Sequence, residues 1–244
     1  MKDVVKMGYE NLAVVPARGN SKGVPKKNLA DLAGKPLLAY GLTAIQSSAN
    51  VNRIVVSTDD AEIADAARRH GAEVPFIRPA RLAEDATPTI PVILHALEWL
   101  ASHEQYTPDY VLVVQPTEPF IRADQIDRVF ETMLERKADS GITMIQVPRP
   151  SHPYHVRHLT PEGCLVFDHP DLHDQHPNRQ SDPKRYAFGN LYWVGREIFL
   201  NTRQLEAGRR IGVEIDPVSA FDINTPEDLE IARSIAVSLN RAAR

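Results

Sequence analysis

A short loop near the start of the chain, reading RGNSKG from Arg18, concentrates basic side chains and glycines. Gly19 and Gly23 permit the tight backbone curvature that points amide groups toward an anion. Arg18, Lys22 and Lys27 supply positive charge suited to a polyphosphate. The spacing matches neither a Walker A loop nor a dinucleotide-binding fingerprint, so a P-loop NTPase and a Rossmann dehydrogenase are not supported. The loop predicts a phosphate site, and a solvated basic turn is the alternative.

A second polar segment, QPTEP from residue 115, follows the most strongly apolar run of the chain. Its two prolines fix the shape of the loop, while Gln115 and Thr117 offer hydrogen-bond donors and acceptors. A contact to a base or a ribose is expected here, although these residues are also common in turns. Arg78, before Pro79, is a weaker candidate, because a surface salt bridge would explain it equally well.

Near the end of the chain, Asp222 and Asn224 flank Ile223. If residues 221–223 form a strand, its alternation puts both polar side chains on the same side. One carboxylate and one amide oxygen can hold Mg²⁺ together with substrate phosphates. The alternative is that both residues organise the start of a helix predicted from Thr225.

The composition excludes several classes of protein. The 244 residues carry a net charge of −4, and 43% are hydrophobic and 25% charged, as in ordinary soluble proteins. Without a basic excess, nucleic-acid binding is not expected. No apolar run approaches the roughly 18 residues that cross a bilayer, so we expect a cytoplasmic protein without a membrane partner. Cys164 is the only cysteine, which excludes an intrachain disulfide and a multi-cysteine zinc site.

The elements that must position these residues follow a regular order. Apolar runs typical of buried strands alternate with segments of helical periodicity. This alternation predicts an α/β fold with a mostly parallel sheet and helices on both faces. Ligands of such sheets bind beyond the carboxyl ends of the strands, where the polar segments lie. The expected strands are residues 12–15, 53–57, 110–114, 142–147, 189–194 and 221–223, and the expected helices include 36–45, 60–70, 93–100, 126–133 and 225–239.

Residues 148–188 interrupt the alternation and hold 7 of the 19 prolines and 6 of the 9 histidines. A segment this long without a helical pattern is usually functional or disordered. We expect a protruding arm that serves as a lid or a dimer contact, between an α/β half at 1–147 and the completion of the α/β domain at 189–244. The histidines also invite a metal site, although His-Pro-rich arms are more often flexible surface. They are His152, His155, His158, His169, His173 and His176.

Taken in order, these segments resemble the motifs of CMP-N-acylneuraminate synthetases. The opening motif, VVPARGNSKGVPKKN from residue 14, is long and specific. The 3-deoxy-manno-octulosonate cytidylyltransferases have a different first loop and are a poorer match. The resemblance covers nearly the whole chain and continues through STDD at 57–60, RPA at 78–80 with LA at 82–83, QPTEP at 115–119, GNLY at 189–192 and DINT at 222–225.

The resemblance implies a three-layer Rossmann-like nucleotidyltransferase fold, commonly as a homodimer that exchanges an arm. It also implies an enzyme that condenses CTP with a nine-carbon 2-keto sugar acid, releases pyrophosphate and uses Mg²⁺. Carried over by position, the catalytic residues are Arg18, Lys22 and Asp222, and the nucleotide-binding residues are Arg18, Ser21, Lys22, Lys27, Asn28, Arg78 and Gln115. The sugar-binding residues are Gln115, Thr117, Arg185 and Asn190, and the metal-binding residues are Asp222 and Asn224.

Two positions depart from this family's pattern. Asn224 stands where the family usually has a second Asp, and Phe188-Gly189-Asn190 stands where it usually has an Asn-Gly-Ala-type sugar motif. An arm histidine, or one of Arg157, Arg179 and Arg185, is expected to reach the sugar carboxylate, in its own or a neighbouring subunit. Two alternatives remain open: another nucleotidyltransferase of the same fold that acts on a sugar phosphate, and a catalytically lapsed nucleotide-binding homologue, which Asn224 favours.

Overall fold

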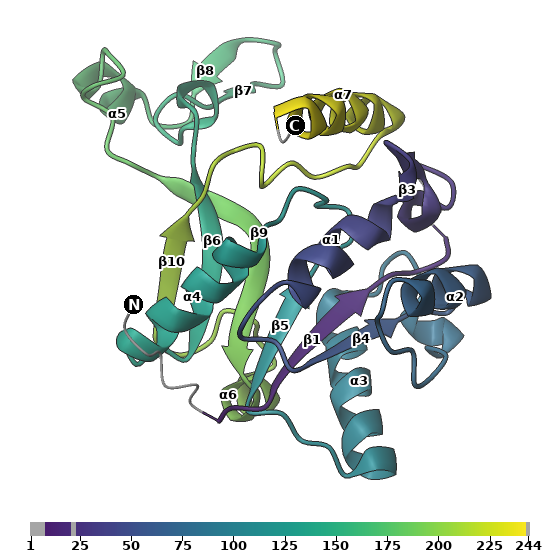
Figure 1. The fold of residues 1–244 in the computed structure, drawn as a ribbon. Coiled ribbons are helices and arrows are strands. Elements are labelled where there is room, and N and C mark those ends of the chain that lie inside the picture. The colour runs from purple at the N-terminus through teal and green to yellow at the C-terminus, as the bar shows by residue number, and fades with distance from the viewer. Residues whose placement is uncertain (1–7, 21–22, 243–244) are drawn as a thin grey trace.

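A computed structural model describes residues 8–20 and 23–242, which are built around a six-stranded sheet (Figure 1). In spatial order the strands are β10 (Arg210–Glu214), β6 (Ser140–Gln146), β9 (Tyr186–Gly195), β5 (Tyr110–Val114), β1 (Asn11–Pro16) and β4 (Arg53–Ser57). β1 pairs in parallel with β4 and β5, and β10 pairs in parallel with β6. β9 alone among these six runs antiparallel, between β5 and β6. The predicted mostly parallel α/β sheet is confirmed.

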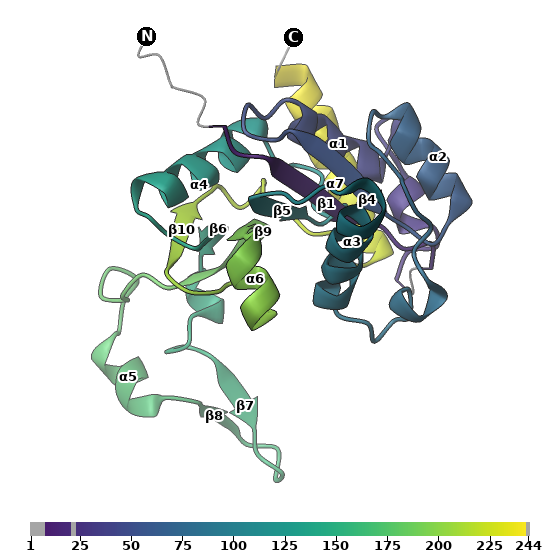
Figure 2. The same cartoon turned by 90° about the horizontal axis from the view of Figure 1, so that it is seen from below.

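Helices cover both faces of the sheet, as the two views in Figures 1 and 2 show. One face carries α1 (Leu37–Gln46), α2 (Ala61–Arg69) and α4 (Ala123–Glu135), and the other carries α3 (Thr89–Glu104) and α6 (Arg196–Thr202). The reason is visible in β1, where Ala13 and Val15 pack on the first face while Leu12 and Val14 pack on the second. Strands that are apolar on both sides require a helical layer on each. These layers give the three-layer architecture.

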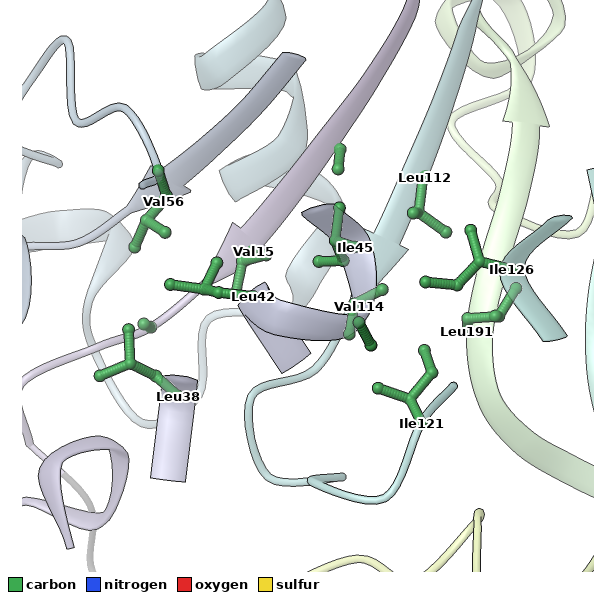
Figure 3. Packing of buried hydrophobic residues seen from close by; sticks show 14 of the residues in the cluster. Val15, Leu38, Leu42, Ile45, Val56, Leu112, Val114, Ile121, Ile126 and Leu191 are labelled. Atoms are coloured by element: carbon green, nitrogen blue, oxygen red, sulfur yellow. The ribbon is translucent and has the colours of Figure 1, made fainter. Parts of the chain in front are cut away.

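The core on the first face is densely filled with aliphatic side chains (Figure 3). Leu42 and Ile45 of α1 lie over Val15 of β1 and Val114 of β5, and all four are at most 2% exposed. Full burial of each such side chain contributes about 1.5–3 kcal/mol. This packing holds the carboxyl ends of β1 and β5 rigidly beside each other.

The last helix, α7 (Pro226–Ala242), begins at a reciprocal cap. The Asp228 N–H donates to Thr225 Oγ1 at 3.2 Å, and the Asp228 carboxylate accepts from the Thr225 N–H at 2.8 Å. The predicted start of this helix is therefore confirmed. The predicted strand at residues 221–223 is wrong: this segment is a loop, because Ile223 is buried against α7 and its N–H donates to the Thr117 carbonyl.

Between β6 and β9 the chain leaves the sheet as a projection that we call the arm, residues 147–185 (Figures 1 and 2). The arm carries elements that the sequence did not predict, namely η3 (Arg149–Ser151), the hairpin β7 (Arg157–Leu159) and β8 (Leu165–Phe167), and α5 (Pro170–Gln175). Residues 186–188, predicted as part of the arm, belong to β9. Short elements elsewhere are η1 (Lys27–Leu29), β2 (Asp31–Leu32), β3 (Lys35–Pro36) and η2 (Ala80–Leu82).

Polar contacts hold the arm together. His155 links His173 and Asp182, with 2.9 Å between its Nδ1 and the Nδ1 of His173 and 2.9 Å between its Nε2 and Asp182 Oδ1. The Arg157 guanidinium lies 4.0 Å from the centre of the Phe167 ring.

Within residues 8–20 and 23–242, neither the arm nor the rest of the chain gathers three His, Cys, Asp or Glu side chains in an arrangement that could hold a metal ion. Over the same residues, none of the helices combines the length and apolar character needed to cross a bilayer.

Candidate active site

The carboxyl ends of β1 and β5 border a cleft of about 570 Å³. The antiparallel β9 brings Phe188, near its start, to the same edge of the sheet. Ligands of open α/β sheets bind at this edge. Eight predicted site residues line the cleft together: Arg18, Lys27, Asn28, Arg78, Gln115, Thr117, Asp222 and Asn224. Ser21 and Lys22 lie outside the described residues.

The two glycines of the basic loop lie at bends of the chain, and both also permit the close approach of a neighbouring segment. A Cβ on Gly19 would lie 2.8 Å from a carboxylate oxygen of Asp60, and a Cβ on Gly23 would lie 2.1 Å from the carbonyl oxygen of Asn224. Neither glycine has a positive φ. A side chain at Gly23 would therefore push the basic loop away from the segment that carries Asn224.

Asp59 ties the basic loop to a buried arginine. Its Oδ1 accepts from the Gly19 N–H at 3.0 Å and from Arg78 Nη2 at 3.2 Å. The neighbouring Asp60 has a different role, because it caps α2 by accepting from the Ile63 N–H at 3.0 Å. Asp59 is thus an organising residue that sequence reasoning missed, since its partners are distant along the chain.

Arg78 presents a buried positive charge to the cleft. It is 4% exposed, and its Nε has no hydrogen-bond partner among the described residues. Burial lowers the pKa of Arg78, while the hydrogen bond and charge of Asp59 oppose that shift. Arginine nevertheless stays protonated in proteins. Arg78 therefore keeps a donor for an anionic ligand, and the predicted nucleotide contact is compatible with its position.

Arg18 and Lys27 bring further positive charge to the same cleft. Arg18 Nη1 lies 3.0 Å from Asp85 Oδ1, and Lys27 Nζ donates to the Ile223 carbonyl at 2.6 Å. Burial lowers the pKa of Lys27, Asp222 opposes the shift, and the charge of Arg18 adds to it. Both cations line the same cleft, which suits a ligand with several negative charges.

The amide side chains of the cleft have different surroundings. Asn28 is 4% exposed and its Nδ2 donates to the Arg18 carbonyl at 2.8 Å, so it holds the basic loop in place. Gln115 and Thr117 follow β5 and line the cleft. Recognition of a base by Gln115 and Asn28 stays a prediction.

The loop that carries Asp222 and Asn224 is joined to the end of β5. The Ile223 N–H donates to the Thr117 carbonyl at 3.0 Å. Asn224 Nδ2 donates to Asp222 Oδ2 at 2.8 Å, so the two side chains are adjacent although they do not lie on a strand. In this arrangement Asn224 turns an N–H, and not an oxygen, toward Asp222. The exposed Asp222 carboxylate is suited to a cation, whereas a cation beside that N–H would be disfavoured.

Glu118 is a second residue to which the sequence assigned no role. It lines the cleft, is 5% exposed, and its Oε2 has no hydrogen-bond partner among the described residues. Burial, together with the nearby charge of Asp222, raises the pKa of Glu118 to about 9. A charged residue between two prolines was the only signal in the sequence, and it did not distinguish this buried position from an exposed turn.

Asn190 and Arg185, both predicted to bind the sugar, lie elsewhere. Asn190 is fully buried, its Oδ1 accepts from Thr143 at 2.8 Å, and its Nδ2 donates to the Ser219 carbonyl at 2.7 Å. It therefore joins the sheet to the segment preceding Asp222 and does not line the cleft. Arg185 is exposed at the base of the arm, where its Nη2 donates to the Tyr154 hydroxyl at 3.0 Å.

A mostly parallel α/β sheet with several cations and a carboxylate at its carboxyl edge suits a nucleotide-binding protein of the nucleotidyltransferase class. Residues 12–242 match the model of the family described as Cytidylyltransferase. The chain belongs to this cytidylyltransferase family.

Two relatives match over nearly their whole length. The pseudaminic acid cytidylyltransferase of Campylobacter jejuni (strain 81-176) is 34% identical over 92% of this chain and 95% of its own. The CMP-N,N'-diacetyllegionaminic acid synthase of Legionella pneumophila is 30% identical over 95% of this chain and 98% of its own. Among solved structures, a CMP:2-keto-3-deoxy-manno-octonic acid synthetase complexed with CTP superposes with a TM-score of 0.68 at 18% identity, covering 94% of this chain and 99% of that one. This last likeness supports the fold.

Proposed function

We propose that this cytidylyltransferase condenses CTP with a nonulosonic sugar acid, of the sialic acid type, to give the CMP-sugar and pyrophosphate. The observation that carries the proposal is the convergence of Arg18, Lys27 and Arg78 on one cleft at the carboxyl edge of the sheet. Relatives named for pseudaminic and legionaminic acids, at 34% and 30% identity, support the class of acceptor. We propose that the protein acts in the cytoplasm.

The reaction mainly requires positioning and charge neutralisation. The anomeric hydroxyl oxygen of the sugar acid attacks the α-phosphorus, and the bond to the bridging oxygen breaks as pyrophosphate leaves. Negative charge grows on the departing phosphates, so fixed cations lower the barrier. Arg18 and Arg78 are held by Asp85 and Asp59, at 3.0 Å and 3.2 Å, and are therefore preorganised for this task.

A divalent cation, Mg²⁺ in the proposal, completes the site. When bound, it would supply Lewis-acid stabilisation of the phosphate oxygens. The exposed Asp222 carboxylate at the cleft fits such an ion, which takes one or two carboxylates together with substrate phosphates. Asn224 fits less well, because its Nδ2 is the atom that faces Asp222.

The acceptor half of the site involves the arm in our proposal. The arm leaves the sheet at the same edge as the cleft, and the exposed side chains of its hairpin include Leu159 and Leu165, at 67% and 63% exposure. We propose that arms are exchanged within a homodimer and that an arm histidine, or one of Arg157, Arg179 and Arg185, reaches the sugar carboxylate of a neighbouring subunit.

The test is pyrophosphate release from CTP, ATP and GTP against a panel of nonulosonic acids and a sugar 1-phosphate. CTP should exceed the purine nucleotides by at least about tenfold, because buried base-edge hydrogen bonds left unmade cost about 1–3 kcal/mol each. Turnover with at least one free sugar acid is the expected result. Equal rates with all three nucleotides would refute the choice of CTP, and turnover with the sugar 1-phosphate alone would refute the acceptor class.

A further inference from the structure

Glu118 is a buried carboxyl group that lacks a full set of hydrogen-bond partners. The residue is 5% exposed, and its Oε2 is enclosed without a hydrogen-bond partner among the described residues. Leaving a buried polar group unsatisfied costs about 1–3 kcal/mol, and more when the group is charged. A side chain that destabilises the ligand-free protein in this way is compatible with a group reserved for a ligand.

The backbone places Glu118 beside Asp222. The Thr117 carbonyl accepts from the Ile223 N–H at 3.0 Å, so Glu118 follows one partner of this hydrogen bond and Asp222 precedes the other. Both residues line the same cleft. Two carboxyl groups from different loops therefore line one cleft, beside the backbone hydrogen bond that joins these loops.

Asn224 cannot serve as the second carboxylate of this site. It is neutral, and its Nδ2 donates to Asp222 Oδ2 at 2.8 Å. That hydrogen bond orients Asp222 instead of adding a negative ligand. Mg²⁺ in nucleotide sites is held by one or two carboxylates plus substrate phosphates, so Glu118 can supply the carboxylate that position 224 lacks.

We propose that Glu118 and Asp222 together form the carboxylate pair that holds the divalent cation of this enzyme, with Asn224 as a positioning residue that orients Asp222. The inference deepens the proposed function, because it specifies the metal ligands of the same site. The chain would thus meet the charge requirement for the cation with an acidic residue from the loop after β5.

The experiment measures Mn²⁺ binding to the nucleotide-free protein from the loss of the free Mn²⁺ signal in electron paramagnetic resonance. The variants are Glu118→Gln, Glu84→Gln as a matched control in the same cleft, and the double variant Glu118→Gln with Asn224→Asp. Loss of a ligand carboxylate should weaken Mn²⁺ binding by about tenfold or more. Glu84→Gln should change it less than about twofold, since a charge away from the ion is screened.

The double variant should regain most of the affinity, because Asn224→Asp restores the number of carboxylates. Thermal unfolding in EDTA checks the fold of each protein, and Glu118→Gln should be at least as stable as the parent.

The proposal is overturned if Glu118→Gln binds Mn²⁺ as the parent does, or if Glu84→Gln weakens binding equally. It is also overturned if the parent takes up no Mn²⁺ at millimolar concentrations, or if the double variant stays as weak as the single one. No sugar acid enters these measurements, so a failure of the proposed acceptor class leaves them interpretable.

Discussion

The cleft loops and the arm leave the same edge of one sheet but are held in different ways. The cleft loops are bound to their neighbours on the sheet, as in the hydrogen bond between Ile223 and Thr117 at 3.0 Å. The arm binds mainly to itself, through His155 and its partners His173 and Asp182 at 2.9 Å each. The difference indicates that the side chains of the cleft are fixed by the sheet, whereas the arm is a separate unit attached at its base.

Burial sharpens the contrast between these two regions. The strands beneath the cleft are apolar and enclosed, with Val15 and Val114 at 2% and 0% exposure. In the arm hairpin, Leu159 and Leu165 are mostly exposed. The arm therefore gains little from hydrophobic burial within one chain, and its attachment depends on polar contacts and on the two ends of the chain that enter it.

The largest effect is expected from removing the arm. Its ends lie close together, since the Val147 N–H donates to the Arg185 carbonyl at 2.8 Å, so residues 151–183 can be deleted without separating β6 from β9. The sheet should fold and bind CTP with an affinity within about threefold of the parent. Turnover with the sugar acid should fall by about 10²-fold or more, because the acceptor is no longer positioned. Pyrophosphate release and calorimetric CTP binding measure the two quantities.

A matched control keeps the arm but changes its surface. Glu162→Ala changes an exposed residue between β7 and β8 and should leave CTP binding and unfolding unchanged within about 0.5 kcal/mol. Analytical ultracentrifugation of the deletion variant should show weaker dimerisation. A deletion variant that remains dimeric and fully active would show that the arm has no part in the acceptor site.

On the cleft side, Asp222→Ala should have the next largest effect. Losing this carboxylate removes much of the cation-dependent charge neutralisation, which is worth several kcal/mol of transition-state stabilisation. The rate should fall by 10²-fold or more. A magnesium titration of pyrophosphate release measures this, with Glu227→Ala, an exposed change on α7, as the control. Activity of Asp222→Ala within about tenfold of the parent at saturating Mg²⁺ would remove Asp222 from the mechanism.

The same contrast explains what the sequence could predict. Strands such as 53–57 and 110–114 were located correctly because their apolar runs are local signals, and the polar groups after them gather as the topology requires. The segment 221–223 was mistaken for a strand because Phe221 and Ile223 are apolar, yet Ile223 is buried against α7 and not within the sheet. A short apolar run does not tell which element will cover it.

Residues whose roles depend on distant partners could not be predicted. Asn190 lies in a motif that resembles a sugar site, but its amide is used by Thr143 and Ser219, 47 and 29 residues away. Glu118 looked like a turn residue because its burial results from the fold of the C-terminal loop over β5. The arm elements were missed because histidine and proline carry no periodic pattern, and polar contacts between side chains replace the apolar spacing that indicates a helix or strand.

The smallest expected effect concerns Glu118 and the stability of the metal-free protein. Burial and the charge of Asp222 raise the pKa of Glu118 from 4.5 to about 9. Between these values the folded protein holds a proton that the unfolded chain releases, so the free energy of unfolding should fall as pH rises through this window. Glu118→Gln has no proton to lose and should lack that decrease. The variant should therefore gain stability relative to the parent as the solution becomes alkaline, and match it most closely near pH 4.5.

Thermal unfolding in EDTA across this pH range measures the difference. For a chain of this size, about 1 kcal/mol corresponds to a shift in Tm of roughly 2–4 °C, so the divergence between the two curves should be readily resolved. The deletion variant that lacks the arm should show the parent's pH dependence, because Glu118 lines the cleft and no residue of the arm does. Parallel curves for Glu118→Gln and the parent would mean that the pKa of Glu118 is the same in the folded and the unfolded chain, and would contradict the expected shift. If the variant without the arm loses the pH dependence of unfolding that the parent shows, then the arm and the cleft are coupled. In that case the sheet alone does not hold the cleft.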